Sequence, residues 1–217
     1  MKNKSFLPVL MALCVLVSIS AKAQGSGPYA FVDGSFRYTS VSTRDGSEKN
    51  NIVSQDEFTI GASLGLGYIV CPNNDGQGIS VEVGFVIGTK NNYYTNVNAM
   101  SDTKLKMLGA ELTFGYHLSV IPHLYYVPEL SVGFFNSEPS QYVEGYKQWH
   151  TGATTHSIGV GLNLLNFEYR SNNTPLGVRF SMGGLSYLRS TENNVPNPVH
   201  SFDFNLNSFT ASVIYYF

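Results

Sequence analysis

The chain has 217 residues and a formal net charge of −2, with 13 Lys and Arg against 15 Asp and Glu, so a nucleic-acid partner, which needs a basic face, is not expected. Hydrophobic residues make up 43 % of the sequence, and Tyr and Phe number 14 each beside 21 Gly, which favours an all-β chain over a helical one. The length predicts a single domain.

The N-terminal segment has the pattern of a secretory signal peptide. Lys2 and Lys4 precede an apolar run over 6–19, and Ala21-Lys22-Ala23 is typical of a cleavage site. The run is too short for the roughly 20 residues of a membrane-spanning helix. We therefore expect residues 1–23 to be removed and 24–217 to form the domain. Three of the 13 basic residues lie in the removed segment, so 10 basic residues remain against 15 acidic ones.

Beyond residue 23 there is no second long apolar run, so any membrane crossing must use strands. In 57–70, every even position from Phe58 to Val70 is apolar, and the residues between them are mostly Gly, Ser or Thr. Large apolar side chains on one face and small or polar ones on the other are typical of a barrel in lipid. The same period of two marks eight segments, approximately 29–41, 57–70, 78–89, 103–118, 123–135, 154–170, 176–188 and 209–217.

The connections between these segments alternate in length. Short ones are expected at 71–77, 119–122 and 171–175, and long ones at 42–56, 90–102, 136–151 and 189–203. Short periplasmic turns alternating with long extracellular loops are typical of outer-membrane barrels. The sequence therefore predicts an all-β, eight-stranded, antiparallel, up-and-down transmembrane β-barrel with four longer extracellular loops.

Three positions break the alternation. The phase slips near Leu164-Leu165 and near Gly183-Gly184, which predicts β-bulges. Pro128 falls within a strand, where it cannot donate a hydrogen bond, so either a bulge or a water-facing neighbour is expected there. An aromatic girdle at the membrane interface is expected from residues near the turn-side strand ends, namely Tyr29, Tyr68, Tyr116, Tyr126, Phe167, Tyr169, Tyr215 and Phe217.

The final segment ends the chain on an aromatic residue, Phe217. With the signal peptide and the segment 165–170 (Leu-Asn-Phe-Glu-Tyr-Arg), this ending resembles the small eight-stranded outer-membrane β-barrels of Gram-negative bacteria, most of all the outer membrane β-barrel domain proteins of Bacteroidetes. The resemblance implies a place in the bacterial outer membrane, contact with its lipid and lipopolysaccharide, and recognition by the barrel-assembly machinery. The residues implied in that assembly signal are Phe209, Val213, Tyr215 and Phe217.

Six ionisable residues fall on the inward phase of the strands, and we expect them to form a polar cluster in the barrel interior: Asp33, Arg37, Glu82, Glu111, Glu129 and Arg179. An interior of eight strands holds side chains but no wide aqueous pore. Buried charges are costly unless they are paired, so a salt-bridged plug is the first interpretation. A gated ion path or a small polar ligand site is the alternative.

No motif defines an active site. Gly61-Ala62-Ser63-Leu64-Gly65 matches the hydrolase pattern G-x-S-x-G, but it lies inside an alternating strand where that chemistry needs a strand-to-helix turn. Small outer-membrane barrels include lipid-modifying enzymes with loop histidines, and His150 and His200 lie in or beside predicted loops. No spacing joins these histidines to a partner, and His150 and His156 are not at a usual metal spacing. We expect no catalytic residue, no metal and no cofactor, and Cys71, alone in 24–217, has no disulfide partner.

The third predicted loop carries Tyr142, Tyr146 and Trp149, aromatic residues of the kind found in contact patches for proteins or glycans. The alternative is that Trp149 packs on the barrel rim at the interface. From these features we expect a structural or surface-interaction role, similar to adhesion, through the extracellular loops. A narrow, porin-like pore or a transport barrel for a small molecule is the second interpretation, and a lipid-modifying enzyme is the third.

Overall fold

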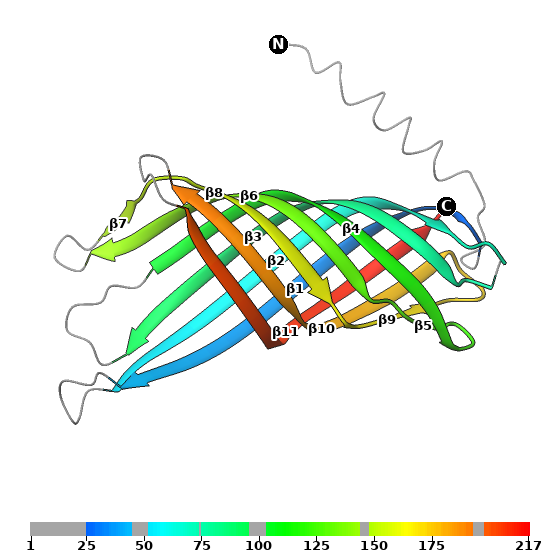
Figure 1. Cartoon of the computed structure of the whole chain (residues 1–217), viewed down its shortest axis with the longest axis horizontal. Coiled ribbons are helices and arrows are strands. Elements are labelled where there is room, and N and C mark those ends of the chain that lie inside the picture. Colours follow the sequence, from blue (N-terminus) through cyan, green and yellow to red (C-terminus); the bar gives the residue numbers. More distant parts are fainter. Residues whose placement is uncertain (1–24, 45–51, 74, 96–102, 144–147, 193–197) are drawn as a thin grey trace, which may run out of the picture.

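In the computed structural model, residues 25–44, 52–73, 75–95, 103–143, 148–192 and 198–217 are described (Figure 1). The predicted signal peptide, 1–23, lies outside them. The described residues form antiparallel strands that run obliquely around one closed wall (Figure 1). The strands are β1 (Gly27–Arg44), β2 (Ile52–Val70), β3 (Gly78–Thr95), β4 (Thr103–Ile121), β5 (Leu124–Tyr126), β6 (Glu129–Val143), β7 (Gln148–Thr151), β8 (Thr155–Asn163), β9 (Leu165–Arg170), β10 (Leu176–Glu192) and β11 (Val199–Tyr216).

The sheet closes because β11 pairs with β10 on one side and with β1 on the other. Two passes of the wall are each built from two pieces: β5 and β6 together lie beside β4, and β8 and β9 together lie beside β10. The short β7 adds only to β6, as a hairpin beyond the ring. The ring therefore has eight passes, and the predicted all-β, up-and-down barrel is confirmed. Among the described residues, no helix is long and apolar enough to cross a membrane.

The two faces of the wall differ as predicted. On β2, Leu64 is 61 % exposed and Leu66 is 56 % exposed, while Ser63, just before Leu64, points into the barrel and donates to Asp33 at 2.6 Å. Apolar side chains from every pass cover the outside in the same way. Exposure of such an apolar surface to water would be unfavourable, and monomeric soluble proteins rarely expose apolar patches above a few hundred Å².

The three predicted irregularities are all present. The chain leaves the ladder at Val127 and Pro128, between β5 and β6, where the amide of Val127 donates to the carbonyl of Asn166 at 2.8 Å. It leaves the ladder again at Leu164, between β8 and β9. The β10–β11 register shifts next to Gly183, which has a φ of 64°, a conformation that glycine adopts without strain.

Two expectations need correction. The strands extend further at the loop end than predicted: β1 and β2 pair up to Arg44 and Ile52, and β3 continues to Thr95. The residues there are largely polar, so the hydrophobic alternation stops although the backbone ladder continues. Of the predicted girdle, Tyr29 is only 1 % exposed because it points into the barrel. Phe217 is 6 % exposed, and its ring packs against Tyr215.

One seam of the barrel is open at its loop end. The register between β1 and β11 runs from Tyr29–Tyr216 to Arg37–Ser208 and stops there. Further up, β1 continues along β2 and β11 continues along β10, so the two strands diverge (Figure 1). At about 3.4 Å per residue and a tilt of about 40°, the paired part of the seam covers roughly 23 Å along the barrel axis, close to the apolar band of a membrane barrel.

Candidate functional site

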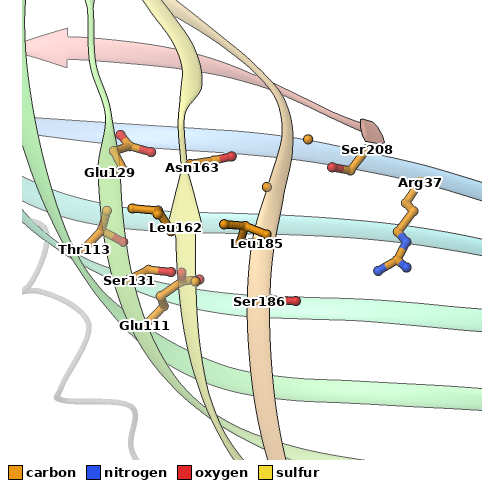
Figure 2. A pocket seen from close by; sticks show the side chains of 13 residues that line it. Arg37, Glu111, Thr113, Glu129, Ser131, Leu162, Asn163, Leu185, Ser186 and Ser208 are labelled. Carbon is orange, nitrogen blue, oxygen red and sulfur yellow. The ribbon is translucent and has the colours of Figure 1, made fainter. Parts of the chain in front are cut away.

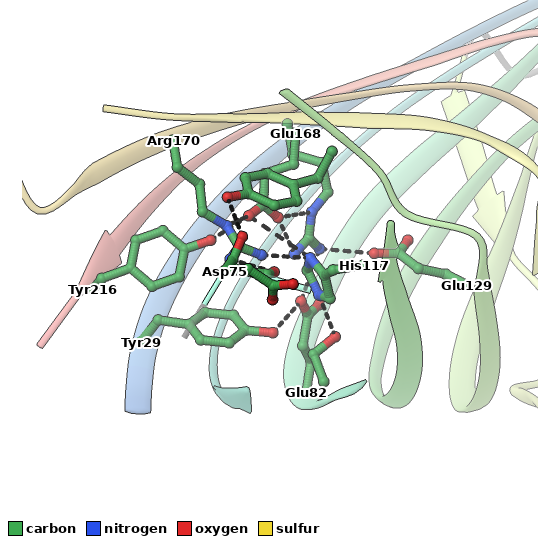
Figure 3. A network of polar contacts seen from close by, with 12 residues as sticks. Tyr29, Asp75, Glu82, His117, Glu129, Glu168, Arg170 and Tyr216 are labelled. Carbon is green, nitrogen blue, oxygen red and sulfur yellow. Dashed lines mark hydrogen bonds and ion pairs between the residues drawn. The ribbon is translucent and has the colours of Figure 1, made fainter. Parts of the chain in front are cut away.

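Figure 3 shows a buried network of charged side chains that includes Glu82, Glu129 and Glu168. Arg179 on β10 contacts all three of these carboxylates. Its Nη1 lies 2.7 Å from Glu82 on β3 and 2.8 Å from Glu129 on β6. Its Nη2 lies 2.8 Å from Glu168 on β9, which is also its register partner. Since β3 and β10 lie on opposite sides of the ring, these ion pairs span the interior and join distant strands.

Glu168 is fully buried and accepts hydrogen bonds on both carboxylate oxygens. Oε1 accepts from Nε of Arg170 and from the hydroxyl of Tyr216, and Oε2 accepts from Nε of Arg179 at 2.9 Å. Nearby, the Tyr29 hydroxyl donates to Glu82 at 2.6 Å. A buried carboxylate with this many donors is compensated for the loss of water.

The side chain of Arg170 closes the turn end of the barrel. Its guanidinium carbon lies 4.2 Å from the centre of the Tyr125 ring and 5.3 Å from that of Tyr216. Its Nη1 donates to the carbonyl of Gly76 at 3.0 Å, which holds the turn between β2 and β3 over the barrel end. Gly76 has a φ of 79°, and a Cβ there would lie 2.1 Å from the Tyr125 hydroxyl, so this approach requires glycine.

Next to this closure, Ser80, His117 and Glu168 are arranged like a catalytic triad, but their hydrogen bonds run in the opposite direction. His117 Nε2 lies 2.8 Å from the Ser80 hydroxyl, and Nδ1 lies 3.9 Å from Glu168. However, Nη2 of Arg170 lies 2.6 Å from that Nδ1, and a guanidinium can only donate. Nδ1 must therefore accept, so the proton lies on Nε2 and is donated to Ser80. This is the opposite of the general base that a serine nucleophile needs.

Toward the loop end, the interior is hollow. The inner cavity, of ≈ 270 Å³, lies against Asp33, Asn166 and Arg179. The middle cavity, of ≈ 210 Å³, lies between Arg37 and Ser208 on one side and Glu111, Thr113 and Glu129 on the other (Figure 2). The outer cavity, of ≈ 560 Å³, adds apolar residues, and Glu111 lines all three. The apolar residues are Met107, Phe135, Val160, Leu188 and Phe202.

The six residues of the predicted interior cluster all line these cavities or the network below them. Three of them, Glu82, Glu129 and Arg179, make the ion pairs described above. Glu168 and Arg170, which complete the network, were not predicted as members of the interior cluster. The phase slip at Leu164 moves the even positions 166, 168 and 170 to the inside, and only that slip, together with the segment 165–170, signalled them in the sequence.

The predicted loop patch is only partly described. Tyr142 on β6 and Trp149 on β7 are register partners in the hairpin beyond the ring, so their positions are adjacent. Tyr146 lies outside the described residues. Of the residues assigned to the assembly signal, Phe209 and Val213 are exposed on the outer face, Tyr215 is half-buried and Phe217 is buried.

Within the described part of the chain, no group of three or more His, Cys, Asp and Glu residues is arranged to hold a metal ion. Cys71 follows β2 in the turn region and is 2 % exposed. Its amide donates to the Ser26 hydroxyl at 2.7 Å, and burial raises the pKa of its thiol.

Cys71 should therefore be nearly unreactive in the folded barrel. In a Cys14→Ser background at pH 8, we expect iodoacetamide to modify the folded protein at least about tenfold more slowly than the boiled, unfolded protein, because both exposure and thiolate content are low. Mass spectrometry of the modified peptide measures the rate. The control is Asn173→Cys in an exposed turn, combined with Cys71→Ser, which should react at the same rate in both states. Equal rates for Cys71 would contradict this placement.

No protein-family model matches the chain, and no curated protein matches it. Among solved structures, neisserial surface protein A is similar at 18 % identity over 88 % of this chain and 98 % of that one, with a TM-score of 0.49. The translocator domain of the autotransporter NalP from Neisseria meningitidis has 11 % identity over 97 % of this chain and 96 % of its own, with a TM-score of 0.46. Ail of Yersinia pestis has 14 % identity over 88 % of this chain and 99 % of its own, with a TM-score of 0.39. At these values, the barrel architecture is established by the strand registers of this chain alone.

Proposed function

We propose that this protein is an outer-membrane β-barrel with a structural and surface-contact role, inserted in the lipid and lipopolysaccharide of a Gram-negative envelope by the barrel-assembly machinery. The observation that carries the proposal is the apolar outer surface of a closed ring whose polar residues point inward. In hydrocarbon, every backbone group must be paired within the protein, and a closed barrel achieves this. Strands that continue past the apolar band would present the loop end outside the cell.

Fractionation and surface labelling test this placement. An epitope inserted between Val143 and Gln148 should be accessible to antibody on intact cells, whereas one inserted at Asn173 should need permeabilised cells. The full chain should sediment with the outer membrane and migrate differently on gels before and after boiling. Recovery of the folded chain in the soluble fraction without detergent would contradict the proposal.

The surface-contact role centres on the β6–β7 hairpin, where Tyr142 and Trp149 are adjacent. Cells that display the protein can be assayed on an immobilised panel of glycans and extracellular-matrix proteins. The double variant Tyr142→Ala/Trp149→Ala should lose any contact that the wild type makes. The neighbouring register pair, changed as Gln141→Ala/His150→Ala, is the matched control. Equal adhesion by both variants, or none by the wild type, would contradict this role.

The proposal includes no catalytic activity. The most triad-like group, at Ser80, is buried and has its histidine proton on the wrong nitrogen, as derived above. The Ser63 hydroxyl of the G-x-S-x-G sequence donates to Asp33 instead of meeting a histidine. A continuous pore is also disfavoured, because the Arg170 closure and the Arg179 network fill the turn end.

A second candidate function, exchange of a small amphipathic molecule with the membrane, is favoured by the open seam between β1 and β11. Beyond Arg37 and Ser208 the strands diverge, and Phe202 and Phe204 on that part of β11 are 74 % and 63 % exposed. Phe202 also lines the outer cavity, so lipid-facing and interior surfaces meet at the seam.

A cross-link distinguishes this candidate. The variant Ser40→Cys/Asn205→Cys, made in a Cys71→Ser background, joins the positions that would continue the β1–β11 register. A spin-labelled stearate should give a motionally restricted signal with the reduced barrel in nanodiscs, and the signal should fall when the seam is closed by the disulfide. An unchanged signal after cross-linking would exclude lateral exchange.

A further inference from the structure

The inner cavity is a blind chamber within the barrel. Its floor includes Arg179 and Asn166, and beneath that floor the Arg170 closure seals the turn end. Toward the loop end, it shares Glu111 with the middle and outer cavities, so these three cavities follow one another along the interior. We therefore expect a solute to enter this chamber from the loop end, since the side chains of Arg170 and Arg179 occupy the turn end.

The charges that face the interior do not balance. With every group counted as ionised, five carboxyl groups stand against three guanidinium groups, a formal surplus of two negative charges among the described residues. The Arg170 and Arg179 side chains contact Glu168, Glu82 and Glu129, which leaves one surplus carboxyl group in that network and a second one among Asp33, Glu111 and Arg37 in the cavity walls. Unmatched charge in a narrow interior is costly, and a bound cation removes that cost. The carboxyl groups are those of Asp33, Glu82, Glu111, Glu129 and Glu168, and the guanidinium groups are those of Arg37, Arg170 and Arg179.

A second, independent feature is a polar side chain with no partner. Asn166 is fully buried and lines the chamber, yet neither its side-chain oxygen nor its nitrogen has a hydrogen-bond partner within the described structure. Oδ1 of Asp33, on another wall of the same chamber, also has none. Buried polar atoms in native structures nearly always have partners, because each unsatisfied group costs free energy. Together these atoms offer two acceptors and one donor toward one space.

The donor set decides the class of cation. No cluster of three acidic, His or Cys side chains in the described residues is arranged for a metal ion, which disfavours a divalent cation. A primary ammonium group carries three N–H donors in a compact charge, which matches acceptors such as Asp33 Oδ1 and Asn166 Oδ1 in the wall of one cavity. A cavity of ≈ 270 Å³ has room for a molecule of several heavy atoms, given that a water in liquid takes about 30 Å³.

We propose that the inner cavity is a binding site for a small primary-ammonium compound that enters from the loop end, held by Asp33, Glu111 and Asn166. The site is independent of the surface-contact role of the hairpin, and it can be tested on the folded protein in uncharged detergent without reference to cellular location.

Isothermal titration calorimetry of the full chain with propylammonium chloride provides the test. We expect saturable binding of one equivalent, no binding of the neutral analogue propanol, and none of tetramethylammonium, which has the charge but no N–H donor. Asp33→Asn and Asn166→Leu should each weaken binding about tenfold or more, the loss expected for one charged hydrogen bond. Asp75→Asn is the matched control, since Asp75 lies in an exposed turn outside the chamber, and its affinity should match the wild type.

A heat-modifiability gel shows that each variant is folded, and the two variants are independent tests if one does not fold. Absence of propylammonium binding to the wild type would overturn the proposal. So would equal binding of propanol, or unchanged affinity in both chamber variants. Potassium binding at the same site with equal affinity would assign it to an inorganic cation and would also overturn the proposal.

Discussion

Replacing Arg179 by glutamine is expected to lower the free energy of unfolding by about 3–5 kcal/mol, because removal of one partner leaves buried charge without compensation. Arg179 contacts Glu82, Glu129 and Glu168 at 2.7 to 2.8 Å, and its own side chain is 6 % exposed. Glutamine keeps much of the volume but removes the positive charge, so three carboxylates face one another in the interior. Urea unfolding in lipid vesicles measures the change.

Two further variants separate this effect from a general loss of charge. Arg189→Gln removes the same charge from an exposed position on the same strand, β10, and should change stability by no more than about 0.5 kcal/mol. Adding Glu129→Gln to Arg179→Gln removes one uncompensated carboxylate and should recover part of the loss. If Arg179→Gln behaves like Arg189→Gln, the network does not stabilise the barrel.

Much of the fold follows from the sequence because a strand between lipid and a polar interior must alternate apolar side chains with small or polar ones. In β2 the apolar side chains occupy every second position, and the structure exposes Leu64 and Leu66 while Ser63 points inward. The breaks at Pro128 and Leu164 were predictable because proline lacks a donor and because a bulge reverses the alternation. The loop-side parts of the strands were not predictable, since backbone pairing between polar residues leaves no periodic apolar signal.

The site was less predictable than the fold. Ion pairing across the ring depends on which inward residues lie at the same level along the barrel axis. That level is set by the barrel shear, which is the stagger of the strand register around the ring, and not by the position in the chain. Arg179 meets Glu82 from the opposite side of the ring, and no local pattern joins them. Tyr29 was assigned to the interface from its position near a strand end, but it points inward and donates to Glu82. The open seam likewise depends on the extra residues of β11 opposite Gly183.

If side chains alone close the barrel, then removing them without changing the net charge should turn it into a channel. The charge-balanced variant Glu82→Ser/Glu168→Ser/Arg170→Ser/Arg179→Ser replaces two carboxylates and two guanidinium groups by small polar groups. An eight-stranded wall has an interior that side chains just fill, so their loss leaves a water-filled path. In planar bilayers the wild type should be silent, and the variant should give discrete conductance steps.

The selectivity of that channel is a stronger test than its appearance. The variant keeps Asp33, Glu111 and Glu129 against Arg37 alone, so acidic groups line the new path and cations should pass preferentially. The reversal potential in asymmetric KCl measures this preference. The pair Glu138→Ser/Arg189→Ser is a charge-balanced control outside the network and should stay silent. A folded quadruple variant that gives no steps would place the closure elsewhere, and anion selectivity would contradict the surplus of negative charge on which the proposed ammonium site depends.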